Sequence, residues 1–275
     1  MLILAATPIG NLSDASPRLV EHLIASKFIA AEDTRSLLKL ANALGIKLNA
    51  RLFSLHEHNE NERIEQILEI AGEDDVLVVS DAGMPTVSDP GFLLVRAAVK
   101  AGVTVTIIPG PSAVLSALAV SGLPTDRFTF EGFLPRKSGD RKKAFESLAR
   151  EPRTMVFFES PHRILESLED ATLVLGSERQ ASVSRELTKK FEHTQRGTLP
   201  ELVEWAKGEP KGEMVLVIAG AQVVEAKSED LVQQVLALIE DGVGLKQAVA
   251  EIAGAAGAGK SELYQSVLEA RKALR

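Results

Sequence analysis

The stretch Val76–Gly91, VLVVSDAGMPTVSDPG, decides how the rest of the chain is interpreted. Its apolar run 77–79 predicts a short strand buried on both faces, as central strands of parallel sheets are. A long loop follows, and Asp89 with Pro90 predicts the first turn of a helix, with Asp89 as its N-cap. In open α/β sheets ligands bind beyond the carboxyl ends of strands. This loop is therefore the first candidate for a binding site.

The composition of this loop favours a neutral or cationic ligand. From residue 80 to residue 91 it contains two aspartates and no lysine or arginine. A phosphate-binding loop uses basic residues and a richer glycine pattern. Connections in α/β units usually run about 2–6 residues, and longer ones tend to be functional. The alternative, a surface turn without a binding role, is the weaker interpretation.

The first half of the chain repeats the same order of strand, loop and helix. Further strands are expected at 2–6, 28–31, 52–55 and 103–108. Five strands alternating with helices predict a mostly parallel, three-layer α/β domain over residues 1–122, with its loops along one edge. Asn59 with Glu62 is typical of a capping box at the start of the helix that follows the third strand.

The second half changes character. Strands are expected at 128–133, 155–159, 181–185, 193–197 and 214–219, with helices near 141–150, 163–175 and 200–207. This pattern predicts a second α/β domain with a mixed sheet over residues 123–222, in which Phe130 and Phe133 alternate as strand core. Residues 223–275 show helical periodicity only. They predict a helical extension, either a helix-turn-helix or a plain three-helix cap.

Composition limits the classes of function. The 275 residues have 45% hydrophobic content, no cysteine and a formal net charge of -7. No apolar run approaches the roughly 20 residues that cross a bilayer, and the N-terminus lacks a signal-peptide pattern, so a cytoplasmic protein without membrane contact is expected. The negative charge argues against non-specific coating of nucleic acid, although a local basic patch can bind structured RNA.

Two local patterns suit binding of RNA phosphate. The densest basic run follows the strand 128–133 and contains Arg136, Lys137, Arg141, Lys142 and Lys143. Phosphate contact is its preferred interpretation, and a solvated face is the alternative. Residues 160–163 open a helix whose free amides, with His162 and Arg163, form a potential anion site. An ordinary capped terminus is the alternative there.

Charged residues also follow the strand expected at 28–31. Glu32, Asp33 and Arg35 lie at its carboxyl end, where a carboxylate could take a proton while Arg35 holds a phosphate. Alternatively, Asp33 or Thr34 caps the next helix and Arg35 pairs with a neighbouring carboxylate, and both interpretations can hold together. His56, after the strand 52–55, is a further candidate for substrate contact or general base.

A metal site is not expected. His56, Glu57 and His58 share the spacing of ligands on a strand. Catalytic zinc typically has three protein ligands, and no further histidine or cysteine lies nearby.

Seven short motifs carry a resemblance to a known family. They are TPIGNLSD (7–14), AEDTR (31–35), SDAGMPTVSDPG (80–91), PGPSA (109–113), FEGFLPRK (130–137), FFESPHR (157–163) and REL (185–187). In this order they resemble the bacterial small-subunit ribosomal RNA (cytidine-2'-O)-methyltransferases, which belong to the tetrapyrrole-methylase fold group. The resemblance covers about residues 2–219, and the helical tail is similar to the C-terminal extension of that family.

The resemblance implies two α/β domains with S-adenosylmethionine in the cleft between them, and a homodimer acting on small-subunit ribosomal RNA or on the assembled small subunit. It places the cofactor against Pro8, Asp81, Ala82, Gly83, Met84, Ser112 and Ala113 of the first domain and Phe158, Leu187 and Met214 of the second. The loop composition agrees, because S-adenosylmethionine carries a sulfonium and no phosphate.

Two other functions are open on the sequence. The same fold could methylate a tetrapyrrole or another small metabolite, but such an enzyme needs neither the basic run nor the helical tail. A non-enzymatic nucleic-acid-binding protein built on the C-terminal helices predicts a basic recognition helix. Residues 261–275 instead mix two glutamates with their basic residues.

Overall fold

The computed structural model describes residues 1–56, 58–221, 228–256 and 258–273. Three positions used above lie outside the described residues: Glu57 of the rejected metal pattern, residue 223 at the predicted start of the helical extension, and Gly257 within that extension. The chain forms two compact units, Met1–Ala221 and Gln222–Arg275, which are described in turn.

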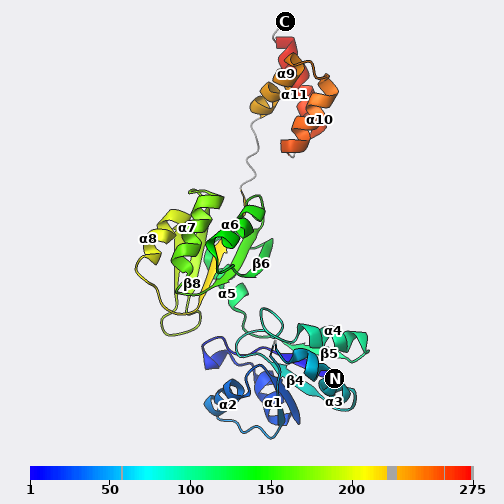
Figure 1. Ribbon diagram of the computed structural model, residues 1–275, viewed down its shortest axis with the longest axis vertical. Coiled ribbons are helices and arrows are strands. Elements are labelled where there is room, and N and C mark those ends of the chain that lie inside the picture. Colours follow the sequence, from blue (N-terminus) through cyan, green and yellow to red (C-terminus); the bar gives the residue numbers. More distant parts are fainter. Residues whose placement is uncertain (57, 222–227, 257, 274–275) are drawn as a thin grey trace. The chain divides into compact units, whose positions relative to one another are not determined.

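The first sheet is wholly parallel, with the strand order β3-β2-β4-β1-β5 (Figure 1). Its strands are β1 (Leu2–Ala5), β2 (Phe28–Ala31), β3 (Arg51–Ser54), β4 (Val76–Val79) and β5 (Val105–Ile108). Its helices are α1 (Pro17–Ala25), α2 (Thr34–Ala43), α3 (Glu60–Glu73) and α4 (Phe92–Lys100), with a short 3-10 helix η1 (Leu12–Asp14) after β1. The predicted parallel α/β arrangement is confirmed.

Alternating side chains along the central strands build two cores. Leu4 and Val78 face one side and pack with residues of α3 and α4. Ile3 and Leu77 face the other side and pack with residues of α1 and α2. Because successive side chains of a strand point to opposite faces, a run that is apolar throughout fits only a strand covered on both sides. The sheet therefore lies between two helical layers.

Helix α4 begins two residues later than expected. Its N-cap is Gly91, with φ of 116°, and its amides are held by a distant side chain: Glu60 Oε1 accepts from the N–H of Gly91 at 3.1 Å and of Leu94 at 3.0 Å. The prediction that Asp89 caps this helix is wrong. The buried Glu60 carboxylate also suits the positive end of the helix dipole.

The expected capping box of α3 is also wrong. Asn59 is the N-cap residue but makes no side-chain cap. Its Oδ1 instead accepts from the N–H of His56 at 2.8 Å, and its Nδ2 donates to the carbonyl of Ser54 at 3.1 Å. Asn59 therefore stabilises the turn after β3.

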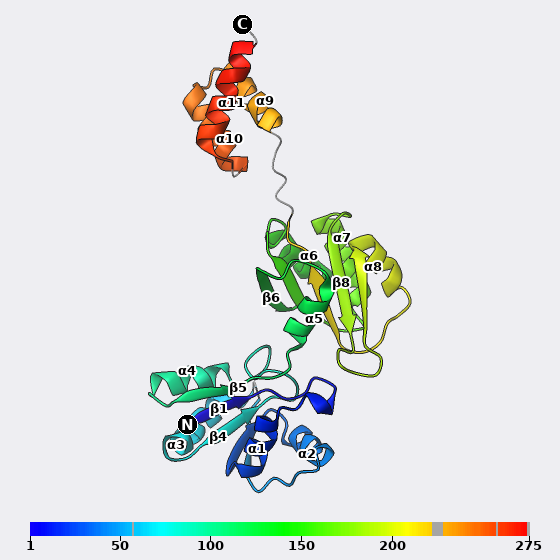
Figure 2. The ribbon, with the colours of Figure 1, turned by 180° about the vertical axis from the view of Figure 1, so that it is seen from behind.

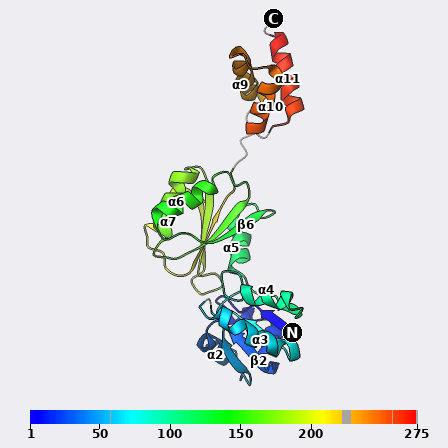
Figure 3. The same cartoon turned by 45° about the vertical axis from the view of Figure 1, so that its right-hand side comes forward.

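The second sheet is mixed, as predicted, with the order β6-β7-β10-β8-β9. Its edge strand β6 is labelled in Figure 3. Its strands are β6 (Phe128–Phe133), β7 (Thr154–Glu159), β8 (Gln180–Arg185), β9 (His193–Thr198) and β10 (Met214–Ile218). Only β6 and β7 pair in parallel. Helices α6 (Ser138–Ser147), α7 (Ile164–Leu175) and α8 (Leu199–Ala206) enclose the large apolar core on one face.

Helix α5 (Ala113–Ser121) covers the other face of this second sheet. It follows directly from β5 of the first sheet, yet its side chains pack with those of the second: Val114, Ala117, Leu118, Val156, Leu187, Val215 and Val217 form one buried cluster. The chain therefore passes from one sheet to the other in the loop 109–112, whereas the predicted domain limit lies ten residues later, at 122. The remaining domain limits stay predictions.

The second unit contains three helices in its described part: α9 (Ser228–Glu240), α10 (Leu245–Ala256) and α11 (Lys260–Ala273) (Figure 2). They enclose a small apolar core that includes Val235, Ala248 and Val267. None of the described helices of the chain has the length and apolar character that would let it cross a membrane.

Candidate active site

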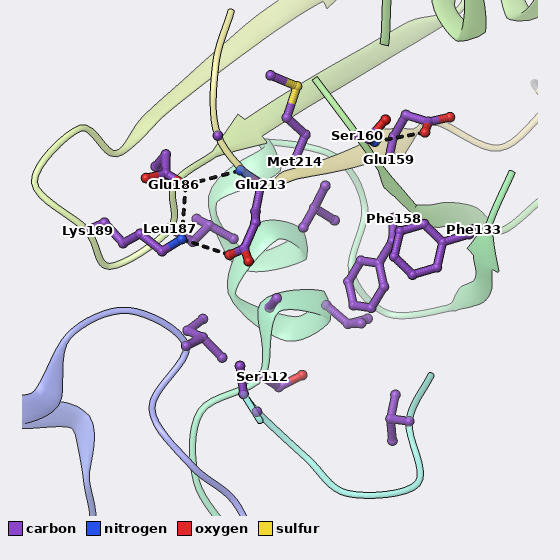
Figure 4. A pocket seen from close by; sticks show the side chains of 18 of the residues that line it. Ser112, Phe133, Phe158, Glu159, Ser160, Glu186, Leu187, Lys189, Glu213 and Met214 are labelled. Atoms are coloured by element: carbon purple, nitrogen blue, oxygen red, sulfur yellow. Dashed lines mark hydrogen bonds and ion pairs between the residues drawn. The ribbon is translucent and has the colours of Figure 1, made fainter. Parts of the chain in front are cut away.

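A cavity of about 620 Å³ lies where loops of the first sheet meet strands and loops of the second (Figure 4). This volume is within the range of about 300–1,000 Å³ that small-molecule sites occupy. It is lined by Ile9, Ala82, Gly83, Met84, Val87, Asp89, Ser112, Ala113, Val114, Phe133, Phe158, Glu159, Ser160, Pro161, Glu186, Leu187, Lys189, Gly212, Glu213, Met214 and Val215.

Most of the cofactor-binding residues suggested by the sequence line this one cavity. They are Ala82, Gly83, Met84, Ser112, Ala113, Phe158, Leu187 and Met214. Pro8 and Asp81 are outside the lining, and Ile9, next to Pro8, takes part in it. The structure thus brings together residues from the loops after β1, β4 and β5 with residues from the second sheet.

A short backbone bridge fixes two of these loops. The N–H of Thr7 donates to the carbonyl of Gly83 at 2.9 Å, and the N–H of Gly83 donates back to Thr7 at 3.1 Å. Gly83 has φ of 79°, which disfavours any side chain. Because the bridge uses the Gly83 amide, the glycine shapes the turn and does not offer that amide to a ligand.

Backbone strain is concentrated in the loops that border the cavity. Thr86 and Ser88 have φ of 74° and 61°, and Glu186 and Thr188 have φ of 50° and 65°. Such values are uncommon outside glycine and cost free energy that the surrounding structure must supply. Strained residues of this kind cluster at binding and catalytic sites.

One wall of the cavity is aromatic. The ring centroids of Phe133 and Phe158 are 5.4 Å apart, and those of Phe130 and Phe158 are 4.9 Å apart. Phe133 is 61% exposed and was expected in the strand core. A register shift between Phe130 and Phe133, with Gly132 at φ of 69°, turns it toward the cavity instead.

The opposite end is polar and carries one cation between two carboxylates. Lys189 Nζ lies 3.0 Å from Glu186 Oε1 and 2.8 Å from Glu213 Oε2 (Figure 4). Burial lowers the pKa of Lys189, but hydrogen bonds to Glu213 and Glu186 outweigh it and the pKa is raised. Among the lining residues that the structure describes, Lys189 alone is basic. A phosphate would therefore find no unpaired cation here.

The loops after β1 and β8 close against each other at this end. The N–H of Asn11 donates to Thr188 Oγ1 at 3.0 Å. A Cβ added at Gly10 would lie 2.4 Å from Lys189 Cγ and 3.0 Å from the carbonyl oxygen of Leu187. Gly10 therefore permits the close approach of the two loops.

The anion site expected at the start of α7 already holds a carboxylate of the chain. Buried Glu159 accepts from the N–H of Ser160 at 2.8 Å and from Ser167 Oγ at 2.7 Å, and its Oε1 pairs with Arg163 Nη2 at 2.5 Å. Arg163 also donates to the carbonyl of Leu134 at 3.2 Å. Phosphate contact by Arg163 stays a prediction, and its guanidinium is already paired within the chain. His162, beside it, is exposed.

The prediction that Arg141 belongs to the RNA-binding run is wrong. Its side chain is only 1% exposed, and its Nε donates to Asp170 Oδ2 at 2.7 Å. Its Nη2 lies 3.3 Å from Glu166 Oε2, and its Nη1 donates to the carbonyls of Pro135 at 3.4 Å and Arg136 at 3.3 Å. Arg141 therefore cannot meet RNA, and it anchors the loop that precedes α6.

The other four residues of the basic run differ in exposure and in whether they form an ion pair. Lys142 Nζ lies 3.4 Å from Asp170 Oδ1 and is partly occupied by that ion pair. Arg136, Lys137 and Lys143 are exposed. These three stay candidates for phosphate contact.

The charged segment 32–35 after β2 has the structural role that the sequence offered as an alternative: a helix cap with an ion pair. Asp33 is the N-cap of α2, accepting from the N–H of Arg35 at 2.8 Å, and it pairs with the Arg35 side chain at 3.2 Å. The hydrogen bond from Arg35 lowers the pKa of Asp33. Glu32, Asp33 and Arg35 do not line the cavity. Their catalytic roles stay predictions, and a carboxylate with a lowered pKa is a poor base.

Asp89 is one of the acidic residues of the cavity that the sequence did not single out as functional. It follows Ser88 on the strained loop and is partly buried. Burial raises the pKa of Asp89 to about 6, and the negative charges of Glu32 and Asp81 add to the effect. The signal in the sequence was the second aspartate of a lysine-free loop, which local capping rules assigned to the next helix.

His56 lies outside the cavity lining, and its role as a base stays a prediction. Its ring is 6.1 Å from that of His58, and its buried Nδ1 has no hydrogen-bond partner among the described residues. The described residues contain no group of three or more histidine, cysteine, aspartate or glutamate side chains that could hold a metal ion.

Comparison with known proteins identifies the family. The model of the tetrapyrrole (corrin/porphyrin) methylases matches residues 1–203. Ribosomal RNA small subunit methyltransferase I of Mycobacterium tuberculosis (strain CDC 1551 / Oshkosh) is 48% identical over 273 residues, covering 98% of this chain and 95% of the relative. The chain belongs to the ribosomal RNA small subunit methyltransferase I family of tetrapyrrole methylases. The resemblance carried by the seven motifs is thereby confirmed.

Solved tetrapyrrole methylases and related proteins share the fold. The methyltransferase CobJ has a TM-score of 0.60 at 20% identity, covering 80% of this chain and 94% of CobJ. Uroporphyrin-III C-methyl transferase from Thermus thermophilus, solved with S-adenyl homocysteine, has a TM-score of 0.53 at 19% identity, covering 79% of this chain and 96% of that one. The family model ends before α9–α11, whereas the mycobacterial relative extends over them.

Proposed function

We propose that this protein transfers the methyl group of S-adenosylmethionine to the ribose 2'-hydroxyl of a cytidine in small-subunit ribosomal RNA. The observation that carries the proposal is the 48% identity to a ribosomal RNA small subunit methyltransferase I over 98% of the chain. That match includes the C-terminal helices, which lie beyond the part shared with the tetrapyrrole methylase family model.

The cavity has the chemistry that this methyl donor requires. S-adenosylmethionine supplies an activated methyl group on a cationic sulfonium and carries no phosphate. Met84, Phe158, Leu187 and Met214 offer apolar contact, and Ser112 offers a hydroxyl. The unpaired cation that a phosphate would need is missing among the described lining residues, whereas carboxylates are present. The product-bound relative from Thermus thermophilus has the same fold, which supports the assignment.

Holding two reactants in line contributes much of the rate in such a displacement. Effective molarity alone supplies roughly 7–11 kcal/mol when the reacting atoms lie about 3–3.5 Å apart. The strained and cross-bridged loops around Gly83 and Ser88 suit this task, because a rigid wall keeps the donor in one position.

The exposed residues Arg136, Lys137 and Lys143 supply phosphate contacts in this proposal, with His162 as a further polar contact. Arg141 donates hydrogen bonds to the carbonyls of Pro135 and Arg136 in the loop that precedes α6. The side chains of Arg136 and Lys137 therefore project from a fixed backbone. A homodimer is part of the proposal, and light scattering tests it by a mass of twice 29.5 kDa. In this proposal the reaction takes place in the cytoplasm.

The test is transfer of a tritiated methyl group from S-adenosylmethionine. Purified protein is incubated with assembled small subunits, with free small-subunit RNA and with a tetrapyrrole precursor. A 2'-O-methyl group blocks alkaline cleavage at the next phosphodiester, so the labelled nucleotide is located as an alkali-resistant cytidine dinucleotide. Label in RNA at such a site supports the proposal. Label in the tetrapyrrole, or in a base, contradicts it.

RNA binding is tested separately by its salt dependence. Changing Arg136, Lys137 and Lys143 to glutamine should reduce the slope of log K against log salt by roughly two to three units, because each lost phosphate contact removes about 0.7–0.9. A control triple with the same charge change, at exposed Arg18, Lys47 and Lys100, should leave the slope near that of the wild type. Equal slopes for both triples would contradict the assignment of this surface.

A further inference from the structure

Asp89 occupies a position that the fold determines tightly. It lines the cavity from the loop between β4 and α4. Ser88 before it has φ of 61°, and Gly91 after it has φ of 116° and is tied to the buried Glu60 carboxylate at 3.1 Å. A loop held in these conformations keeps the Asp89 carboxylate at one place on the cavity wall.

The surroundings of Asp89 keep its carboxylate basic. Glu32 after β2 and Asp81 after β4 are the charged groups whose fields reach it, and both are negative. Burial is the larger effect, and together they raise the pKa of Asp89 to about 6, although a hydrogen bond with Ser80 acts in the opposite direction. A base with a pKa near neutrality is ionised at pH 7 and still accepts a proton readily.

Each of the other carboxylates of the lining has a cationic partner. Glu159 is held by Arg163, Ser160 and Ser167. Glu186 and Glu213 share Lys189. Among the described acidic residues of the cavity wall, Asp89 alone has no lysine or arginine within ion-pair distance.

We propose that Asp89 is the general base that accepts the 2'-hydroxyl proton of the substrate ribose. The inference rests on the proposed function. The ribose oxygen forms a bond to the methyl carbon while the bond from that carbon to sulfur breaks, its electron pair stays on sulfur, and the hydroxyl proton moves to Asp89. Glu32 and Asp81 act as positioning residues, because their charges tune the basicity of Asp89 and they lie outside the lining.

A different role for the same carboxylate would be to attract the sulfonium cation. The two roles predict different binding behaviour. A carboxylate that holds the sulfonium favours S-adenosylmethionine over S-adenosylhomocysteine, whose sulfur is neutral. A base that acts on the ribose hydroxyl leaves the affinities for both molecules unchanged when it is replaced by its amide.

The experiment compares Asp89→Asn with Asp74→Asn in the full-length protein. Asp74 is a matched control, since it precedes β4 at the opposite end of the strand and pairs with Lys27 at 2.8 Å. Single-turnover methylation of small-subunit RNA, at saturating substrate and donor, is measured from pH 5 to pH 8. Calorimetry gives the affinities for S-adenosylmethionine and S-adenosylhomocysteine, and carboxyl-carbon NMR of the free protein gives the pKa of Asp89.

We expect Asp89→Asn to lose about 10²–10⁴ in single-turnover rate with both affinities unchanged. The wild-type rate should rise with pH to a plateau, with a midpoint near the NMR pKa of Asp89, and Glu32→Gln should shift both midpoints to lower pH. Asp74→Asn should follow the wild type throughout.

Three results overturn the inference: a near-normal rate for Asp89→Asn, a selective loss of S-adenosylmethionine affinity, or an ordinary carboxyl pKa in the NMR titration. A wild-type protein that labels no RNA refutes the proposed function instead, so the two failures are distinguishable.

Discussion

Replacing Arg141 with alanine should destabilise the protein and not merely weaken RNA binding. Removal of one partner from a buried ion pair typically costs 3–5 kcal/mol, because the other charge stays buried without compensation. Asp170, whose side chain is 9% exposed, would lose its 2.7 Å contact but keep Ser138 Oγ at 3.0 Å and Lys142 at 3.4 Å. These remaining contacts place the cost near the lower end, at about 3 kcal/mol.

The assay is equilibrium unfolding in denaturant, followed by the fluorescence of Trp205. This is the single tryptophan of the sequence, and it packs against the same core as α6 and α7. Lys143→Ala, on the same helix but exposed, is the control and should stay within about 0.5 kcal/mol of the wild type. Adding Asp170→Asn to Arg141→Ala should recover part of the lost stability, since the unpaired charge is then removed.

The reasoning is refuted if Arg141→Ala unfolds within about 1 kcal/mol of the wild type and loses RNA affinity as Lys143→Ala does. That outcome would return Arg141 to the group of phosphate-binding residues and would mean that the buried pair with Asp170 contributes little.

Three further predictions follow from the packing around the cavity. Gly10→Ala should weaken S-adenosylmethionine binding several-fold in calorimetry, because its Cβ forces the two loops apart, while Gly72→Ala, with nothing within 4 Å, should not. Glu60→Gln should lower the free energy of unfolding by about 1–2 kcal/mol through the weakened cap of α4, with exposed Glu62→Gln as the neutral control. Asp89→Asn should stabilise the fold above pH 6. Because the pKa of Asp89 is raised in the folded protein, its ionised carboxylate opposes folding above pH 6, by about 1–2 kcal/mol after allowance for partial exposure. Chemical unfolding measured across pH should show that the difference in unfolding free energy between Asp89→Asn and the wild type vanishes below about pH 4.

The sequence was sufficient for those parts of the fold in which neighbouring residues carry the pattern. The run Val76–Val79 is buried on both faces in the structure, as its uniform apolarity predicts. The loops after such strands necessarily gather at one edge, and for this reason Met84 and Ser112, 28 positions apart, were both placed in the cavity.

The errors arose where a distant residue outweighs the local pattern. Asp89 followed by Pro90 has the form of a helix start, but Glu60, about thirty residues earlier, supplies that cap and leaves Asp89 in the cavity wall. Arg141 belongs to a basic run in the sequence, but Asp170 on another helix decides its burial. Phe133 was assigned by strand alternation, which the bulge before it interrupts. Partners that are remote in sequence leave no local periodicity from which they can be inferred.

The packing of α5 has a consequence for dividing the protein into fragments. A fragment that starts at residue 123 would follow the limit suggested by the sequence but would lack the helix that covers Val156, Val215 and Val217. Those side chains would face water, and such a fragment should aggregate. A cut in the loop 109–112 would keep this cover, but it would divide the cavity wall next to Ser112. The two sheets are therefore not interchangeable modules: a recombinant hybrid that exchanges one of them must take α5 with the second sheet and rebuild the ligand-binding wall at the junction.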